Sequence, residues 1–216
     1  MALSGTGFVV LFGVAAWLYG GGAGADAAGI ADYYARAASR RHQEAGFAAL
    51  LVACLLLLCY VAVLRTRLSP AEPVATVLLL SGGATGVLLI AADALWAATA
   101  FSVEIQGTAS VVDPGSHLLV EDAAFVLVVS AAAAAVPLVL ATSREVLRGG
   151  WLPRWFAVLG WLAAAGLLGA YWYVPLALFL AWVAAGSLLL WRQGPRAADP
   201  GGRGVASRSG EIRGVG

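Results

Sequence analysis

One acidic side chain stands alone inside a long apolar stretch of this chain. Asp93 is the only charged residue between Pro73 and Val103. Ionisable groups within an apolar span are costly to bury, and they mark ion or proton pathways more often than structural positions. At the helical rise per residue, Asp93 lies about 30 Å along the span from Pro73. We therefore expect it near the outer boundary of a membrane, at a depth from which a carboxylate reaches water.

A second group of polar residues follows a short connection. Asp113-Pro114 is typical of a helix N-cap followed by proline at the first helical position. In that register His117 and Glu121 are i,i+4 neighbours, with Asp122 beside them. These positions and the preceding acids define one candidate outer-face polar cluster: Asp93, Glu104, His117, Glu121 and Asp122. The cluster could serve as a proton relay or an outward-facing cation site. Alternatively, these are solvated loop acids and a helix N-terminus that favours negative charge.

Several other chemistries have no support in the sequence. His42 and His117 are the only histidines and both lie outside the deep apolar stretches, which argues against a bis-histidine haem. No lysine is present for a Schiff base. Cys54 and Cys59 lie about 140° apart around one helix and have no metal-ligand spacing. We expect no cofactor, no metal ion and no catalytic residue, and the chain carries no basic patch suited to nucleic acid.

The elements that position these residues are apolar and long. The 216 residues are 61% hydrophobic and 12% charged, with a mean hydropathy of +0.86. Soluble domains average about 25% charged residues. We predict an all-α, polytopic transmembrane helical bundle with six spans, formed by residues 6–25, 45–64, 74–99, 116–142, 155–172 and 175–191.

Two of these spans are open to another interpretation. The first could be a cleaved leader ending at Ala23-Gly24-Ala25, but it lacks a positive n-region, so a retained span is favoured. The last uncharged stretch, 155–191, has 37 residues and is too long for one crossing. Its aromatic residues predict a hairpin that turns near Val174-Pro175, and this hairpin is either fully crossing or re-entrant.

Arginine placement predicts the orientation. With the N-terminus inside, the outer loops hold only Arg36, Arg40 and Arg41, and the other ten arginines lie on the inner side or in the tail. The positive-inside rule then places both termini in the cytoplasm and the protein in the cell membrane. Residues 194–216 are rich in Gly, Pro, Arg and Ser and predict a disordered cytoplasmic tail.

Residues 26–44 predict an outer helix or loop at the membrane interface. An apolar face and two i,i+4 ion pairs indicate helix: the face is Ile30, Tyr33, Tyr34 and Ala37, and the pairs are Asp32–Arg36 and Arg40–Glu44. The segment either lies at the headgroups or covers an outward-opening cavity as a lid; the first is favoured.

Small residues at i,i+4 spacing predict close helix packing. Gly82 and Gly86 form a G-x-x-x-G motif, and Gly166 and Gly169 belong to similar pairs with neighbouring alanines. These faces serve packing within the bundle, a homo-oligomer or a membrane partner. Pro137 is expected to kink its span.

Two short runs of this sequence resemble a known group. The runs Ile30-Ala31-Asp32-Tyr33-Tyr34 and Gly150-Trp151-Leu152-Pro153-Arg154-Trp155 are similar to segments of small six-span actinobacterial membrane proteins of the DUF4386-like type. The resemblance implies a helical inner-membrane protein. It supplies no functional residue.

Three functions compete on these grounds. A non-enzymatic accessory or interaction protein of the membrane is ranked first, because nothing in the sequence demands more. The alternative is a small proton- or cation-coupled transporter that uses the outer acids. A membrane enzyme using His117 with a nearby acid ranks third, since no spacing places a nucleophile beside a base.

Overall fold

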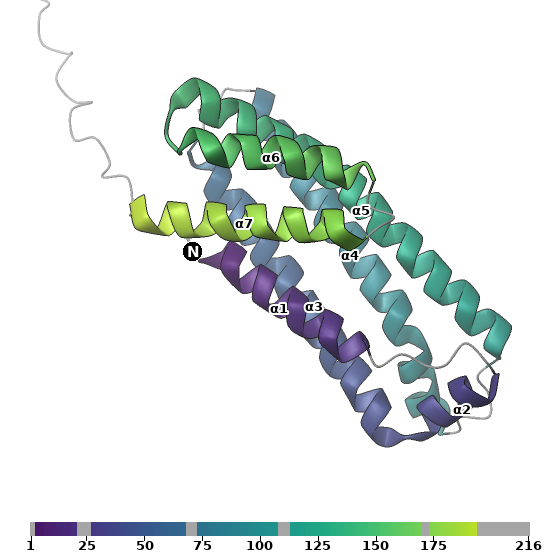
Figure 1. Ribbon diagram of the computed structural model, residues 1–216. Helices are drawn as coiled ribbons and strands as arrows, with labels where there is room; N and C mark the ends of the chain where they lie inside the picture. Colours follow the sequence, from purple (N-terminus) through teal and green to yellow (C-terminus); the bar gives the residue numbers. More distant parts are fainter. Residues whose placement is uncertain (1–2, 21–26, 68–72, 108–112, 170–172, 194–216) are drawn as a thin grey trace, which may run out of the picture.

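The computed structural model describes residues 3–20, 27–67, 73–107, 113–169 and 173–193, and every regular element in them is an α-helix (Figure 1). In chain order these are α1 (Ser4–Tyr19), α2 (Ala27–Ala35), α3 (Ala37–Arg65), α4 (Pro73–Gln106), α5 (Pro114–Gly149), α6 (Arg154–Leu167) and α7 (Tyr173–Gln193).

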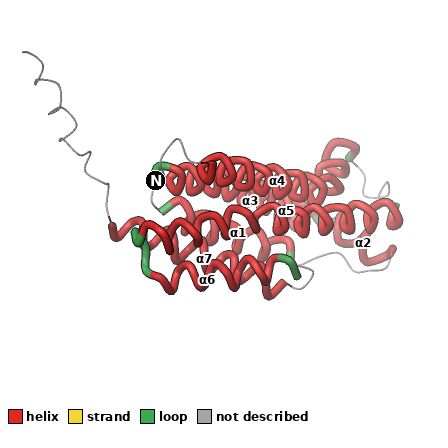
Figure 2. The backbone as a smooth tube through the Cα atoms, turned by 90° about the horizontal axis from the view of Figure 1, so that it is seen from above, coloured by secondary structure: helices red, strands yellow, loops and turns green. Residues whose placement is uncertain are grey.

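The six longer helices form a closed ring. Packing runs from α1 to α3, α4, α5, α6 and α7, and α7 returns to α1. The two short helices of the ring, α1 and α6, do not extend along its whole length. Figure 2 shows that α6 and α7 stop well short of the end at which α2 lies. The half of the bundle nearer to α2 therefore has fewer helices than the other half.

Four helices are long and apolar enough to cross a membrane: α3, α4, α5 and the Leu176–Gln193 part of α7. The 36 residues of α5 span about 54 Å, which exceeds the hydrocarbon thickness of about 30 Å. The 16 residues of α1 and 14 of α6 are apolar but span only about 24 and 21 Å. Four of the six expected crossings therefore correspond to helices of membrane length, and the other two correspond to shorter apolar helices.

Helix boundaries differ from the expected segments in two places. The outer segment is not one helix, since α2 ends at Ala35 and α3 begins at Ala37 after an extended Arg36. At the last hairpin, α6 ends at Leu167 and α7 begins at Tyr173, so Val174-Pro175 lies within the first turn of α7. A proline is tolerated there, because the N–H that it lacks would have no partner within the helix. The expected disordered tail, 194–216, lies outside the described residues.

The start of α5 follows the predicted cap. Asp113 is the N-cap, Pro114 follows it, and an Asp113 carboxylate oxygen accepts hydrogen bonds from Ser116 N at 2.8 Å and Ser116 Oγ at 2.7 Å. These bonds hold the pKa of Asp113 below its usual range, because they stabilise the carboxylate. The cap fixes the register that places His117 and Glu121 on one face of α5.

Pro137 interrupts the hydrogen bonding inside α5, and a side chain from α4 fills the gap. The Ser81 hydroxyl donates to the carbonyl of Ala134 and accepts from Leu138 N at 3.0 Å. One hydroxyl thus satisfies two backbone groups of the interrupted turn. This contact ties α4 to α5 in the middle of the bundle.

Glycines allow close helix contact at Gly82 and Gly86, as expected, and at two positions that the sequence did not single out. Gly82 is buried against Val61 of α3, and Gly86 packs near Leu58. Gly169 is exposed beyond the end of α6, and its nearest neighbour is the carbonyl of Gly166 in the same turn. The closest approaches that the sequence did not single out are at Gly160, against α5 and α7, and Gly186, against α3 and α6.

The apolar face of α2 is buried in protein. Ile30, Tyr33 and Tyr34 pack on Ala100 and Val103 of α4. The expected Asp32–Arg36 pair is present at 3.0 Å. Arg40 pairs with Glu104 at 2.6 Å and not with the expected Glu44, because α3 turns its side chain toward the end of α4. Thus α2 covers one end of the bundle.

Candidate functional site

A cavity of about 550 Å³ lies toward the α2 end of the ring, between α1, α3, α4, α5 and the start of α7. This size falls within the usual range of small-molecule sites, about 300–1,000 Å³. Its walls come from five helices. The larger apolar side chains that line it are Phe12, Leu50, Leu89, Trp96, Phe125 and Leu176.

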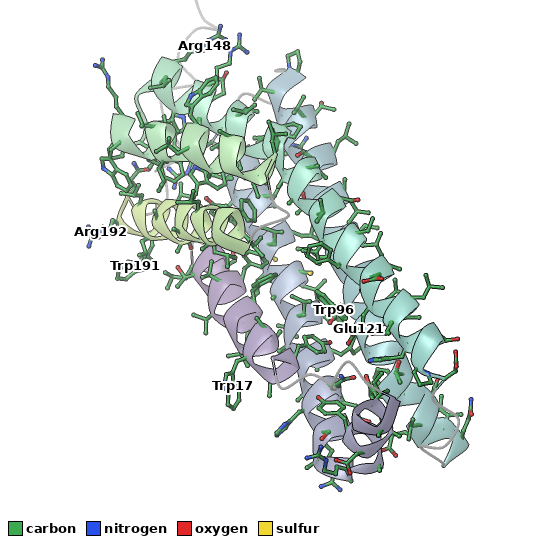
Figure 3. All side chains as sticks on the ribbon, turned by 45° about the vertical axis from the view of Figure 1, so that its right-hand side comes forward. Trp17, Trp96, Glu121, Arg148, Trp191 and Arg192 are labelled. Carbon is green, nitrogen blue, oxygen red and sulfur yellow. The ribbon has the colours of Figure 1, made fainter. Side chains whose placement is uncertain are left out.

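Polar groups line the same cavity. Tyr19, Gln43, Glu121 and Asp122 contribute to its wall. Figure 3 shows Trp96 and Glu121 close together in the space between α4 and α5. Asp122 and Gly20 are exposed, so the cavity reaches the protein surface on its polar side. The arrangement combines an apolar chamber with carboxylates near its entrance.

Asp93 lies behind this wall. Its side chain is fully buried, and its Oδ1 accepts a hydrogen bond of 2.6 Å from the hydroxyl of Tyr19. Its other oxygen, Oδ2, is buried without a hydrogen-bond partner among the described residues. The expected exposure of Asp93 to water is therefore absent, because Tyr19 at the end of α1 covers it. An acid with one free oxygen next to a cavity is suited to gaining and losing a proton.

His117 and Glu121 are brought together as their spacing predicts. His117 Nε2 lies 3.3 Å from Glu121 Oε1, and His117 Nδ1 lies 3.3 Å from Thr99 Oγ1 of α4. The imidazole is buried, and the ring of Tyr34 from α2 meets it edge-on at 5.3 Å between centroids. Glu121 therefore connects two environments, since it contacts His117 on one side and lines the cavity on the other.

The five candidate residues do not form one cluster. Three of them, His117, Glu121 and Asp122, lie along the first turns of α5. Asp93 is connected to the cavity by its hydrogen bond with Tyr19, which lines it. Glu104 is separate, since its carboxylate is held by Arg40 at 2.6 Å. Within the described residues, no three His, Cys, Asp or Glu side chains come together in a way that could hold a metal ion.

Tyr34 organises the layer between α2 and the bundle. Its hydroxyl exchanges hydrogen bonds with the side-chain amide of Gln43, at 3.3 and 3.2 Å, and Arg40 donates to its backbone carbonyl at 2.7 Å. Burial raises the pKa of Tyr34 to about 12, so this hydroxyl stays protonated at neutral pH. Gln43 also lines the cavity, which links α2 to its polar side.

Thr99, His117 and Glu121 follow the order hydroxyl, imidazole, carboxylate that hydrolases use. Their surroundings do not suit that chemistry. His117 is only 5% exposed, and its ring is covered by Tyr34. The residues that line the cavity include Glu121 but neither Thr99 nor His117. A bulky substrate would therefore meet the carboxylate and not the hydroxyl.

Sequence reasoning missed Tyr19, Gln43 and Trp96. In the sequence alone, Tyr19 and Trp96 are ordinary interfacial aromatic residues, whereas in the fold their ring centroids lie 5.7 Å apart. Gln43 had a weak signal, as a polar residue on the side of α3 that faces Tyr34. Only the positions of α1, α3 and α4 relative to one another reveal that they share a cavity.

Comparison of the chain with protein-family models, with curated proteins and with solved structures gave no match. The resemblance to small six-span actinobacterial proteins stays a hypothesis.

Proposed function

We propose that this protein is a small proton- or cation-coupled transporter of the cell membrane, with a solute site in its outer half. The observation that carries the proposal is the cavity of about 550 Å³ that is lined by Glu121 and Asp122 and bordered by the buried Asp93 through Tyr19. Acids within membrane bundles serve as ion and proton sites far more often than they serve stability.

The proposed topology has six crossings with both termini in the cytoplasm. The exposed arginines support this orientation: Arg148 and Arg192 lie at the end of the molecule opposite α2 (Figure 3). In this arrangement α2, the start of α5 and the mouth of the cavity face outward. The short helices α1 and α6 cross a locally thinned bilayer or end below its outer surface.

The coupling step follows from the two acidic positions. Glu121 receives a proton from outside through His117 or from water at the mouth, since both are within reach. Asp93 is shielded by Tyr19 and becomes accessible when the Tyr19 hydroxyl moves away from Oδ1. Alternate exposure of Asp93 to the cavity and to the inner half of the bundle would couple solute movement to proton movement.

The experiment is a flux assay on the full chain in liposomes that contain a pH-sensitive dye. Quaternary ammonium ions, amines, carboxylates and neutral solutes are added outside in turn. At least one class is expected to change the internal pH more than in empty liposomes, and Asp93→Asn abolishes the change. The matched control is Asp32→Asn, which removes the same charge from an exposed ion pair on α2.

Two results would overturn the proposal. One is a complete lack of solute-driven pH change with every class. The other is an unchanged response in Asp93→Asn that elutes as a folded protein in size-exclusion chromatography.

An accessory role through small-residue faces has less support. Gly82 and Gly86 are covered by Val61 and Leu58 of α3, so that face is used inside the bundle.

A further inference from the structure

The charge of the cavity indicates what it binds. Glu121 and Asp122 supply two carboxylates, and Asp93 adds a third acid behind Tyr19. None of the described residues that line the cavity is basic. The nearest histidine, His117, contacts Glu121 from outside the cavity lining, and Arg40 is engaged by Glu104 and backbone carbonyls. An anionic solute would meet like charge with no compensating group.

The walls of the cavity are aromatic and aliphatic. Phe12, Tyr19, Trp96 and Phe125 present ring faces or edges to it from three helices. Aromatic rings attract organic cations through their quadrupole, and the attraction grows as water is excluded. A small hydrated ion such as Na⁺ would leave these apolar walls in contact with water, whereas a solute with an apolar body would bury them.

We propose that the cavity binds lipophilic organic cations, namely ammonium or phosphonium ions with an aromatic or aliphatic body. The charged centre lies near Glu121 and Asp122, and the apolar body extends toward Leu50, Leu89 and Leu176. These cations are the substrate class of the transporter proposed above. Their binding does not require transport, and only their movement across the membrane rests on that proposed function. Such cations partition into membranes, so they are present at the depth of the cavity.

The test uses two isosteric probes of opposite charge. The full chain in phosphatidylcholine nanodiscs is dialysed to equilibrium against tetraphenylphosphonium or tetraphenylborate, and uptake by empty nanodiscs is subtracted. The phosphonium ion is expected to bind saturably at about one per protein, and the borate ion not to bind saturably. This contrast needs no variant, so it does not depend on any substituted protein folding.

Variants then locate the site. Glu121→Gln combined with Asp122→Asn is expected to weaken phosphonium binding by about tenfold or more, because both attracting charges are lost. Trp96→Leu keeps apolar volume and is expected to weaken it by about fivefold, through loss of the cation–π contact. Asp32→Asn changes the net charge on the surface of α2 and leaves the affinity within about twofold.

The outcomes separate this inference from the proposed function. Equal or tighter binding of tetraphenylborate, or unchanged affinity in the folded double variant, overturns the cation site. Saturable phosphonium binding without any solute-driven pH change supports the site and overturns transport. A pH change driven by neutral or anionic solutes, without phosphonium binding, supports transport and overturns the site.

Discussion

At the scale of single residues, the contact between Tyr19 and Asp93 links the cavity to a buried acid. It joins the last residue of α1 to an acid in the middle of α4, at 2.6 Å. Asp93 has no other hydrogen bond among the described side chains, and its Oδ2 is already without a partner. A buried acceptor that loses its donor costs more free energy than a typical hydrogen bond contributes.

Tyr19→Phe is therefore expected to lower the free energy of unfolding by about 1–3 kcal/mol, since Asp93 is left without a partner. The measurement is far-UV circular dichroism during titration with sodium dodecyl sulfate in mixed micelles. Tyr60→Phe is the matched control, because the Tyr60 hydroxyl is fully buried and has no hydrogen-bond partner in the described structure. Removal of the Tyr60 hydroxyl is expected to leave the free energy of unfolding unchanged or to raise it. A larger loss in Tyr60→Phe than in Tyr19→Phe would contradict this account.

At the scale of elements, α4 contributes side chains to several of the contacts that hold the bundle together. It packs between α3 and α5, and it contributes Ser81 to the interrupted turn of α5, Asp93 to the hydrogen bond with Tyr19 and Glu104 to the ion pair with Arg40. Its residues Gly82 and Gly86 allow Val61 and Leu58 of α3 to pack closely against it. Changes in the α3–α4 distance would therefore affect both the stability of the bundle and the shape of the site.

Two adjacent glycines of α4 provide a test of this packing. A methyl group at Gly82 would lie 2.6 Å from Cγ2 of Val61, whereas one at Gly83 would have nothing within 4 Å. Gly82→Ala is expected to lower the free energy of unfolding by about 1–3 kcal/mol through overpacking. Gly83→Ala is expected to be neutral, or stabilising by up to about 1 kcal/mol, from better helix propensity. The same detergent titration measures both, and equal effects of the two substitutions would contradict the close α3–α4 contact.

At the scale of the whole molecule, different charged groups lie at the two ends. One end holds α2, the Arg40–Glu104 pair and the acids of α5, and the other end holds Arg148 and Arg192 (Figure 3). The cavity reaches the surface beside Gly20 and Asp122, toward the first of these ends. The proposed direction of solute access therefore depends on which end faces the exterior.

Cysteine labelling determines that orientation. In a Cys59→Ser background, Asp32→Cys and Arg148→Cys each place a thiol at an exposed position, where the native side chains are 72% and 61% exposed. Cys54 is buried and is expected to stay unreactive. A membrane-impermeant maleimide should label Asp32→Cys in intact cells and Arg148→Cys only after permeabilisation. The reverse pattern would contradict the positive-inside assignment.

Much of the helical framework could be predicted from the sequence. Long uncharged stretches predict membrane-length helices because unpaired backbone groups are intolerable in hydrocarbon. The cap at Asp113 and the i,i+4 spacing of His117 and Glu121 are local relations along one helix, and the structure confirms both. Such features depend only on neighbours in the chain.

Tertiary packing decided the rest. Arg40 has both Glu44 and Glu104 within reach in principle, and only the position of α4 selects the second. Asp93 is hydrogen-bonded to Tyr19, 74 positions away in sequence, and the cavity has walls from five helices that are far apart in the chain. Contacts between helices depend on how each helix is rotated about its axis and how deep it lies in the membrane. The apolar pattern of a single helix determines neither, because hydrocarbon solvates all faces of an apolar helix almost equally.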